Sequence, residues 1–107
     1  MHRQPLFVLL LSLGFLGACT WLPLTPEGEQ VRVETSAQAV ANCENKGTTH
    51  ASTKHKVGFI PRGTDFVKEE LATLARNDAA KMGGNTVVPQ GPVENGQQTF
   101  AIYACRR

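Results

Sequence analysis

The N-terminal apolar stretch limits how much of this 107-residue chain is left to fold. Residues 6–16 are apolar, Arg3 precedes them with a positive charge, and the small residues Gly17 and Ala18 follow. A helix that spans a bilayer needs about 20 apolar residues, so this stretch is too short to do so. A positive charge, a short apolar run and small residues in this order are typical of a secretory signal peptide. We therefore predict that residues 1–18 are a signal peptide and that the rest of the chain holds one small domain.

Cys19 directly follows Leu16, Gly17 and Ala18, and this sequence resembles the lipobox of bacterial lipoproteins. In that family the cysteine sulfur receives a diacylglycerol, cleavage exposes the cysteine amino group, and the new N-terminus is usually acylated as well. Several acyl chains hold a protein on a membrane, because each buried methylene contributes about 0.8 kcal/mol. The resemblance also implies delivery to the outer membrane, since Thr20 stands where an aspartate commonly signals inner-membrane retention. The alternative is an ordinary secreted protein in which Cys19 is left in the precursor or stays free.

Lipidation of Cys19 leaves two cysteines for the folded domain, Cys43 and Cys105. An unpaired thiol is a liability in an oxidising compartment, which favours a disulfide between these two residues. Closing a loop of about 60 residues would stabilise a small domain by about 4 kcal/mol in the chain-entropy model. The alternative is a catalytic or redox cysteine, but neither residue lies in a C-x-x-C pair. We predict one disulfide, Cys43 to Cys105.

The segment after the lipidation site, "TWLPLTPEGEQ", is rich in proline and in small and polar residues. This composition predicts that residues 19–29 form a lipidated N-terminus and an extended tether. Polar and apolar residues then alternate in "EQVRVE", which places Val31 and Val33 on one face of a short strand. We expect the α+β lipoprotein domain to comprise residues 30–107.

The clearest element is "TDFVKEELATLARNDAAKMGGN", which predicts a helix. Either Thr64 or Asp65 can cap its N-terminus, and acidic residues early with basic residues late suit the helix dipole. Apolar residues recur at helical spacing along one stripe, and we expect this stripe to face the core. The residues of the stripe are Val67, Leu71, Leu74, Ala75 and Met82. Asp78 falls within the same arc, and we expect it to lie at the end of the buried face or to accept a hydrogen bond.

Gly83, Gly84 and Asn85 are expected to form the C-terminal cap of this helix. A glycine readily adopts the left-handed conformation that such a cap requires. Two strands follow, "NTVVPQ" and "QQTFAIYAC", and the turn region "GPVENG" between them predicts that they form a hairpin.

The second strand of this hairpin carries one of the paired cysteines. Phe100 and Ile102 would share one face of the strand and Cys105 the other, so the disulfide lies on the opposite side of the sheet or a bulge intervenes. A further strand is expected at residues 43–50. Together these elements predict an α+β fold: a small antiparallel sheet of three to four strands, one main helix packed on it, and one disulfide.

The segment "KGTTHASTKHK" holds two histidines, His50 and His55. A metal site would need a third ligand, normally with a carboxylate or thiolate nearby, and the surrounding lysines would repel a cation. A solvated loop is therefore the better interpretation. The formal net charge is only +2, from 11 basic and 9 acidic residues, which is not the electrostatic pattern of a nucleic-acid binder. We expect no metal, no cofactor and no nucleic-acid partner.

Several stretches together resemble a small bacterial lipoprotein family, domain of unknown function 4156. They are the lipobox, "GEQVRV", the cysteine at 43 followed by Gly47, the run "LARNDAAKMGGNTVV" and the closing "YAC". The most specific positions, bracketed by Cys43 and Cys105, are Asn77, Ala79, Ala80, Met82, Gly83, Gly84 and Asn85. The family has no assigned activity, so the resemblance implies a location and a fold. The portion "AAKMGGNTV" is also distantly similar to the envelope-stress-sensing outer-membrane lipoprotein of the Rcs phosphorelay, but this chain has only two cysteines after the lipidated one.

These features favour a non-enzymatic binding or envelope-sensing module, held on the outer membrane through lipidated Cys19 and facing the periplasm. Its partners would be the membrane itself and an envelope protein or glycan. The alternative is a small envelope enzyme that uses His50, His55 or Asp78 as its acid or base. No nucleophile, base and orienting residue stand together in the sequence, which argues against catalysis. A third possibility is a spacer or stress-induced surface protein without a specific ligand.

Overall fold

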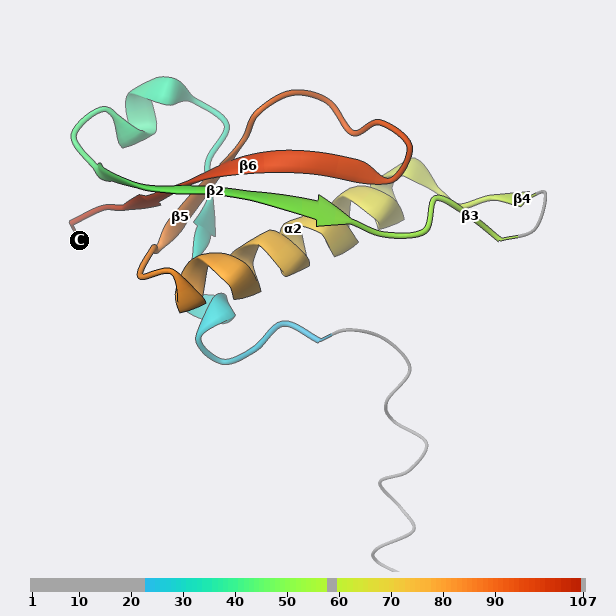
Figure 1. Ribbon diagram of the computed structural model, residues 1–107, viewed down its shortest axis with the longest axis horizontal. Helices are drawn as coiled ribbons and strands as arrows, with labels where there is room; N and C mark the ends of the chain where they lie inside the picture. Colours follow the sequence, from blue (N-terminus) through green and yellow to red (C-terminus); the bar gives the residue numbers. More distant parts are fainter. Residues whose placement is uncertain (1–22, 58–59, 107) are drawn as a thin grey trace, which may run out of the picture.

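A computed structural model describes residues 23–57 and 60–106 of the protein. The predicted signal peptide and the predicted lipidation site, Cys19, lie outside the described residues. Within the described part, no helix is long and apolar enough to cross a membrane. The elements in chain order are η2 (Gly28–Gln30), β1 (Arg32–Val33), η3 (Ala37–Val40), β2 (Glu44–Ser52), β3 (Lys56–Val57), β4 (Ile60–Pro61), α2 (Thr64–Lys81), β5 (Thr86–Pro89) and β6 (Gln97–Ala104) (Figure 1).

Four strands form the main sheet in the spatial order β1-β5-β6-β2. The β5–β6 and β6–β2 pairs are antiparallel, whereas β1 and β5 are parallel. The predicted α+β fold with one main helix and one disulfide is confirmed, but the sheet is mixed and not purely antiparallel as expected. The physical reason is that α2 leads the chain back across one face of the sheet, so β5 starts at the same end as β1 (Figure 1).

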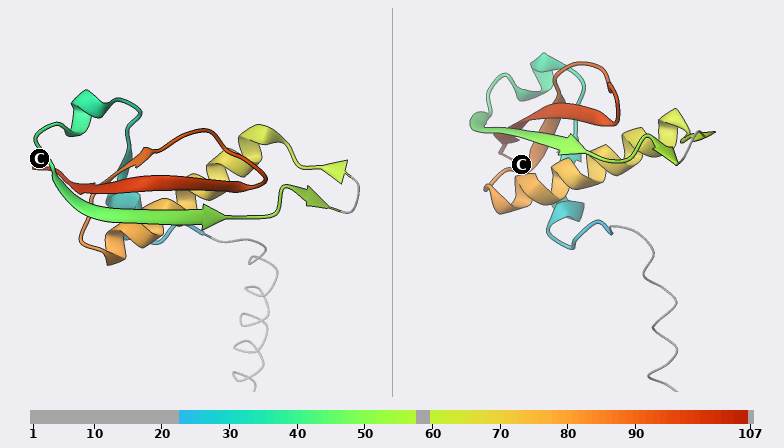
Figure 2. Two further views of the ribbon diagram at one scale, coloured as in Figure 1. Left: turned by 45° about the horizontal axis from the view of Figure 1, so that its top comes forward. Right: turned by 45° about the vertical axis from the view of Figure 1, so that its right-hand side comes forward.

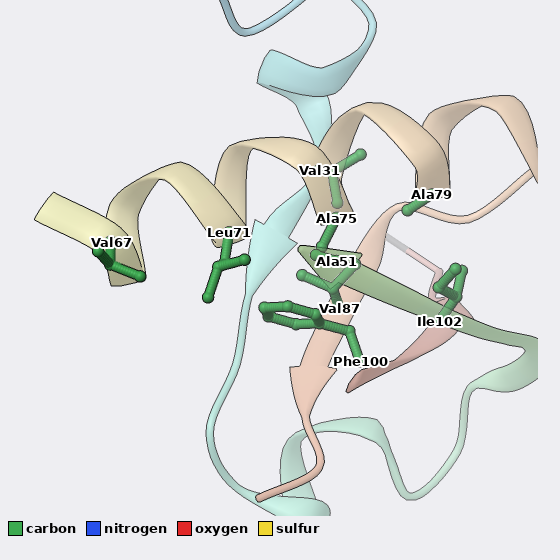
Figure 3. Close-up of a cluster of buried hydrophobic side chains, with 9 residues drawn as sticks. All are labelled: Val31, Ala51, Val67, Leu71, Ala75, Ala79, Val87, Phe100 and Ile102. Carbon is green, nitrogen blue, oxygen red and sulfur yellow. The ribbon is translucent and has the colours of Figure 1, made fainter. Parts of the chain in front are cut away.

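The main core lies between α2 and one face of the sheet (Figure 3). Its residues are Val31, Ala51, Val67, Leu71, Ala75, Ala79, Val87, Phe100 and Ile102. The predicted helical stripe therefore faces the core, with Leu74 partly buried against this cluster. Met82 departs from the prediction, because it lies just after the last turn of α2 and its side chain is 40% exposed.

The N-terminus of α2 is not capped by either predicted residue. Gly63 is the N-cap, so Thr64 and Asp65 already lie inside the helix. Gly63 has no side chain that could accept a hydrogen bond, and its carbonyl oxygen accepts one from the Val67 N–H at 3.1 Å. Asp65 still lies in the first turn, where its negative charge suits the helix dipole.

The other face of the sheet carries a second, smaller buried patch. Val88 and Ala101 are cross-strand partners in β5 and β6, and both are buried outside the main core. η3 lies on this side of the sheet in every view, away from α2, and its Val40 is also buried (Figure 2). The central strands are therefore covered on both faces.

The predicted hairpin of β5 and β6 is confirmed, and Asn95 and Gly96 form its tip. Both residues have positive φ angles, 52° and 72°, as the two central residues of a type I′ turn require. The flanking residues exchange backbone hydrogen bonds, from Glu94 N–H to the Gln97 oxygen at 3.0 Å and back at 2.9 Å. Asparagine followed by glycine is the sequence that most favours this turn.

Cys43 and Cys105 form the predicted disulfide, with their Cα atoms 4.5 Å apart. They continue the β2–β6 ladder just beyond its last pair, Glu44 and Ala104. Because Ile102 points into the main core, strand alternation turns Cys105 to the face away from α2. A bulge also interrupts β2 near its start. The first arrangement considered from the sequence is therefore present, and the bulge in β2 does not change the face on which Cys105 lies.

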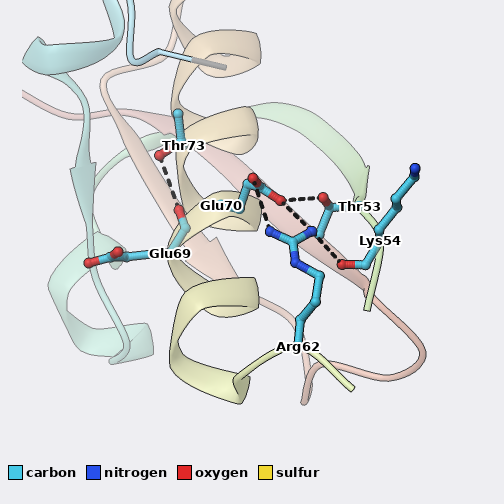
Figure 4. Close-up of polar contacts among 6 residues, drawn as sticks. All are labelled: Thr53, Lys54, Arg62, Glu69, Glu70 and Thr73. Atoms are coloured by element: carbon cyan, nitrogen blue, oxygen red, sulfur yellow. Dashed lines mark hydrogen bonds and ion pairs between the residues drawn. The ribbon is translucent and has the colours of Figure 1, made fainter. Parts of the chain in front are cut away.

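A second, two-stranded sheet formed by β3 and β4 projects beyond the N-terminal end of α2 (Figure 1). Arg62 joins it to the body of the protein: its Nη1 donates to the Lys54 carbonyl oxygen at 2.8 Å and lies 3.3 Å from Glu70 Oε1 (Figure 4). The Thr53 hydroxyl donates to the same Glu70 oxygen. The Arg62 guanidinium also lies 4.5 Å from the centre of the Phe66 ring. The strand expected at residues 43–50 is confirmed as β2, in which His50 is exposed, whereas the end of the segment interpreted as a solvated loop begins β3.

We expect the Glu70→Gln variant to lower the free energy of unfolding by about 1 kcal/mol at neutral pH. The Thr53 hydrogen bond holds the pKa of Glu70 below its usual value, and Arg62 adds to this against the opposing effect of burial. A carboxyl group with a lowered pKa stabilises the fold above its unfolded pKa, and this contribution is lost as the pH falls through the folded pKa. The difference from wild type should therefore shrink below about pH 4.

Urea denaturation of both proteins at a series of pH values measures this difference. Glu69→Gln is the matched control, because Glu69 is the neighbouring helix residue and its side chain is exposed. That variant should unfold like wild type throughout. A Glu70→Gln deficit that stays constant from neutral to acidic pH would contradict the assignment.

Candidate functional site

A polar groove of about 530 Å³ lies beside the disulfide. Its lining includes both cysteines and Arg32, Glu34, Gln38, Asn42, Thr86 and Arg106. Val87 points into the main core, so the preceding residue, Thr86, points to the opposite face, and Arg32 is its partner across the β1–β5 ladder. The groove, called the disulfide groove below, is therefore on the sheet face away from α2.

Asn85 holds the backbone of Cys105, one of the residues that line the disulfide groove. Its side-chain oxygen accepts a hydrogen bond from the Cys105 N–H at 2.8 Å, and its amide donates to the Cys105 carbonyl oxygen at 2.7 Å. The Thr86 hydroxyl, in a residue only 2% exposed, donates to the same Asn85 oxygen at 3.1 Å. The C-terminal end of β6 is thus held by a covalent bond on one side and by Asn85 on the other.

The turn that carries Asn85 ends α2 with a Schellman motif. Gly83 has a φ of 80°, and the Gly84 N–H donates to the Ala79 carbonyl oxygen at 2.9 Å. A methyl group on Gly84 would overlap the Ile102 side chain and lie 3.2 Å from the Tyr103 oxygen, so the turn packs directly on β6. These glycines, singled out from the sequence as a helix cap, also place Asn85 beside the disulfide.

The charges of the disulfide groove are positive on balance. Arg32 and Arg106 are exposed, and Glu34 is half-buried. Among the described residues, ion pairs join only Lys46 to Glu44 and Arg62 to Glu70. Both arginines of the groove are therefore available to a ligand. A guanidinium group presents its N–H donors in a planar fork that matches carboxylate and phosphate oxygens.

Residues 23–31, called the strap below, lie against α2 in the structure, although most of them fall in the tether expected from the sequence. Asn77 Oδ1 accepts hydrogen bonds from the Thr25 N–H at 2.9 Å and the Thr25 hydroxyl at 3.1 Å. The Asn77 amide donates to the Pro23 carbonyl oxygen at 3.2 Å. Gly28 is buried, and a methyl group there would overlap Asn77 Oδ1. The strap is thus closely packed on the helix.

The residues considered for catalysis lie in different surroundings. The His50 ring nitrogens lie 2.8 Å from Thr99 Oγ1 and 3.0 Å from Gln97 Oε1. Asp78 accepts a hydrogen bond from the Thr49 hydroxyl at 2.8 Å, one of the two roles expected for it. Because consecutive strand residues point to opposite faces, His50 and Asp78 lie on opposite sides of the sheet.

His55 lies beside the hairpin tip, where a methyl group on Gly96 would be 3.2 Å from His55 Nδ1. A hollow of about 310 Å³ next to His50 includes Glu94 but neither His55 nor Asp78. Within residues 23–57 and 60–106, no group of three or more histidine, cysteine or acidic side chains is placed to hold a metal ion. The structure does not bring the candidate catalytic residues together.

The fold and the disulfide groove define a class of small proteins in which one helix covers a mixed four-stranded sheet and a disulfide links the two longest strands at their ends. The chain belongs to the family described as Domain of unknown function (DUF4156), whose sequence model matches residues 22–105. The resemblance to this family seen in the sequence is therefore confirmed. Comparison with curated proteins and with solved structures gave no match.

Sequence reasoning identified the disulfide and the glycine turn but missed the polar side chains of the disulfide groove. Arg32 alternates with Val31 and Val33, and this pattern could have placed it on the face away from the helix. Gln38, in the short helix η3, and Arg106, beyond the last strand, follow no periodic pattern. Their approach to the groove depends on how the chain folds back.

Proposed function

We propose that the protein is a non-enzymatic binding module, anchored to the periplasmic face of the outer membrane through lipidated Cys19. We further propose that the disulfide groove binds a carboxylate- or phosphate-bearing component of the cell envelope. The resemblance of the sequence before Cys19 to a lipobox supports the anchoring. The observation that carries the binding role is the pair of arginines, Arg32 and Arg106, that line one groove without an ion-pair partner among the described residues.

The construction of the groove supports recognition of an anionic group. The Cys43–Cys105 bond and Asn85 hold the part of the lining at the two cysteines, so this part is in place before a ligand arrives. Preorganised sites lose less conformational entropy on binding. The amide side chains of Gln38 and Asn42 add hydrogen-bond donors and acceptors to the lining. Glu34 would repel negative charge on its side of the groove, so the anionic group of a ligand should bind away from Glu34.

The enzyme alternative requires an acid or base close to the bound substrate. His50, His55 and Asp78 are not part of the lining of the disulfide groove. A general acid or base has to lie within hydrogen-bond reach of the reacting group. Binding at the groove is therefore the function that the geometry favours over catalysis by these residues.

Binding of soluble peptidoglycan fragments with free carboxylates should be weakened at least about tenfold in the double variant Arg32→Gln Arg106→Gln, because charge-assisted hydrogen bonds contribute about 1.5–3 kcal/mol each. Calorimetric titration of the detergent-solubilised lipoprotein measures the affinity. Lys81→Gln is the matched control, since it removes an exposed cation at the end of α2 and outside the groove.

Fragments with amidated carboxylates, and inorganic phosphate as competitor, separate the chemistry of the ligand. Competition by phosphate would show that the groove recognises an anionic oxygen group in general. Equal binding of free and amidated fragments, or unchanged binding by the double variant, would contradict the proposal.

A further inference from the structure

The strap crosses the outer face of α2, the face opposite the main core. Consecutive residues of a helix point about 100° apart, so Arg76 and Asn77 lie on either side of this outer face. Asn77 binds the beginning of the strap at Pro23 and Thr25. Arg76 binds its end, where Nε donates to the Val31 carbonyl oxygen at 2.9 Å. The chain therefore runs along the outer face of α2 before it enters the sheet at β1 (Figure 2).

The length of chain that precedes the strap limits where the lipid can lie. Only residues 20–22 separate Cys19 from Pro23. At about 3.6 Å per residue, the Cα atom of Cys19 lies at most about 14 Å from that of Pro23. Pro23 is held on the outer face of α2 by Asn77. A lipid on Cys19 thus emerges on the α2 side of the protein.

We propose that the side of the protein formed by the strap and by the outer face of α2 near Phe66 rests on the surface of the membrane that holds the acyl chains, so that the disulfide groove faces away from the lipid. This inference rests on the lipidation of Cys19 given under the proposed function. It adds an orientation, which a freely extended tether would not impose. Because the strap is bound to α2, the domain cannot turn freely about the lipid anchor.

The side chains on this face suit a phospholipid surface. Phe66 and Asn77 are about three helical turns apart and therefore share the outer face of α2. Phe66 is 40% exposed, with the Arg62 guanidinium over its ring at 4.5 Å. An aromatic ring beside a cation is favoured at the headgroup level of a membrane. The ring can contact the apolar acyl region there, while the cation stays hydrated.

The charges around Phe66 include both signs. Arg62 lies over the ring and is paired with Glu70, and the acids Asp65 and Glu69 are close to Phe66 along the helix. These charges do not add up to a strongly basic surface. The acyl chains would therefore provide the affinity for the membrane, and this surface would set the orientation.

Tryptophan quenching in vesicles tests the orientation. The full lipoprotein is placed in phosphatidylethanolamine vesicles with a minority of phosphatidylglycerol and with headgroup-labelled nitroxide lipids. The only tryptophan of the sequence, Trp21, is replaced by Phe, and one reporter is introduced as Phe66→Trp. The matched control reporter is Tyr103→Trp, an aromatic replacement in β6 at a position whose side chain points away from α2. We expect the reporter at position 66 to be quenched several times more strongly.

The strap supplies a second test. Asn77→Ala, and independently Gly28→Ala, should release the strap while leaving the lipid attached, and the difference between the two reporters should then disappear. In the protein with an unchanged strap, equal quenching of both reporters, or stronger quenching at position 103, would overturn the orientation. Flotation of the same protein with the vesicles would then still support the anchoring. A lipoprotein that does not float with vesicles would overturn the anchoring and the orientation together.

Discussion

Replacing Cys43 and Cys105 with alanine is expected to lower the free energy of unfolding by about 4 kcal/mol. The bond closes a loop with a sequence separation of 62, and opening it restores conformational entropy to the unfolded chain. The core of a domain of about 80 residues rarely supplies more than about 3–5 kcal/mol, so the variant should be close to unfolded at physiological temperature. Urea denaturation of the double variant and of the oxidised wild type measures the difference.

Reduction of the wild type by dithiothreitol is the matched control and should destabilise it to the level of the double variant. The single variant Cys43→Ala should cost nearly as much as the double variant, because either replacement opens the same bond. Asn85 still holds the Cys105 backbone in these variants, so stabilising osmolytes should recover a native-like fold. An unfolding midpoint that does not respond to dithiothreitol would show that the bond contributes nothing measurable.

The Cys19→Ser variant is expected to be absent from outer-membrane fractions and to remain uncleaved by the lipoprotein signal peptidase. Serine cannot accept the diacylglycerol thioether, and residues 6–16 are too short to span a bilayer. The loss should be essentially complete, because each methylene of the missing acyl chains would have contributed about 0.8 kcal/mol. Metabolic labelling with a palmitate analogue, followed by membrane fractionation, measures both consequences.

Thr20→Asp provides a matched control for this experiment. It keeps Cys19 and should still be labelled, but the aspartate should retain the protein in the inner membrane, as in the lipoproteins that the N-terminus resembles. Equal labelling of Cys19→Ser and wild type would remove the basis for the anchor. Labelling of Thr20→Asp in the outer membrane would leave the anchor intact and contradict the sorting argument alone.

Local patterns in the sequence were sufficient to predict much of the fold. The spacing of Val67, Leu71 and Ala75 predicts a helix and the side that it buries, because helical periodicity is a property of neighbouring residues. The β5–β6 hairpin follows from a turn sequence between two apolar runs, since only a few residues decide such a turn. The pairing of Cys43 with Cys105 followed from the small number of cysteines in the chain.

Three features were decided only by the tertiary structure. β1 pairs in parallel with β5, the strap docks on Asn77, and Arg32 and Arg106 line one groove. Each joins residues that are far apart in the chain, such as Thr25 and Asn77 at a separation of 52. A sequence pattern reports which face of an element is apolar, whereas a long-range contact depends on how whole elements compete to bury that surface and to satisfy their backbone hydrogen bonds. The sequence by itself therefore determined the main helix, the β5–β6 hairpin and the disulfide, and the packing of α2 on the sheet decided where the strap and the groove lie.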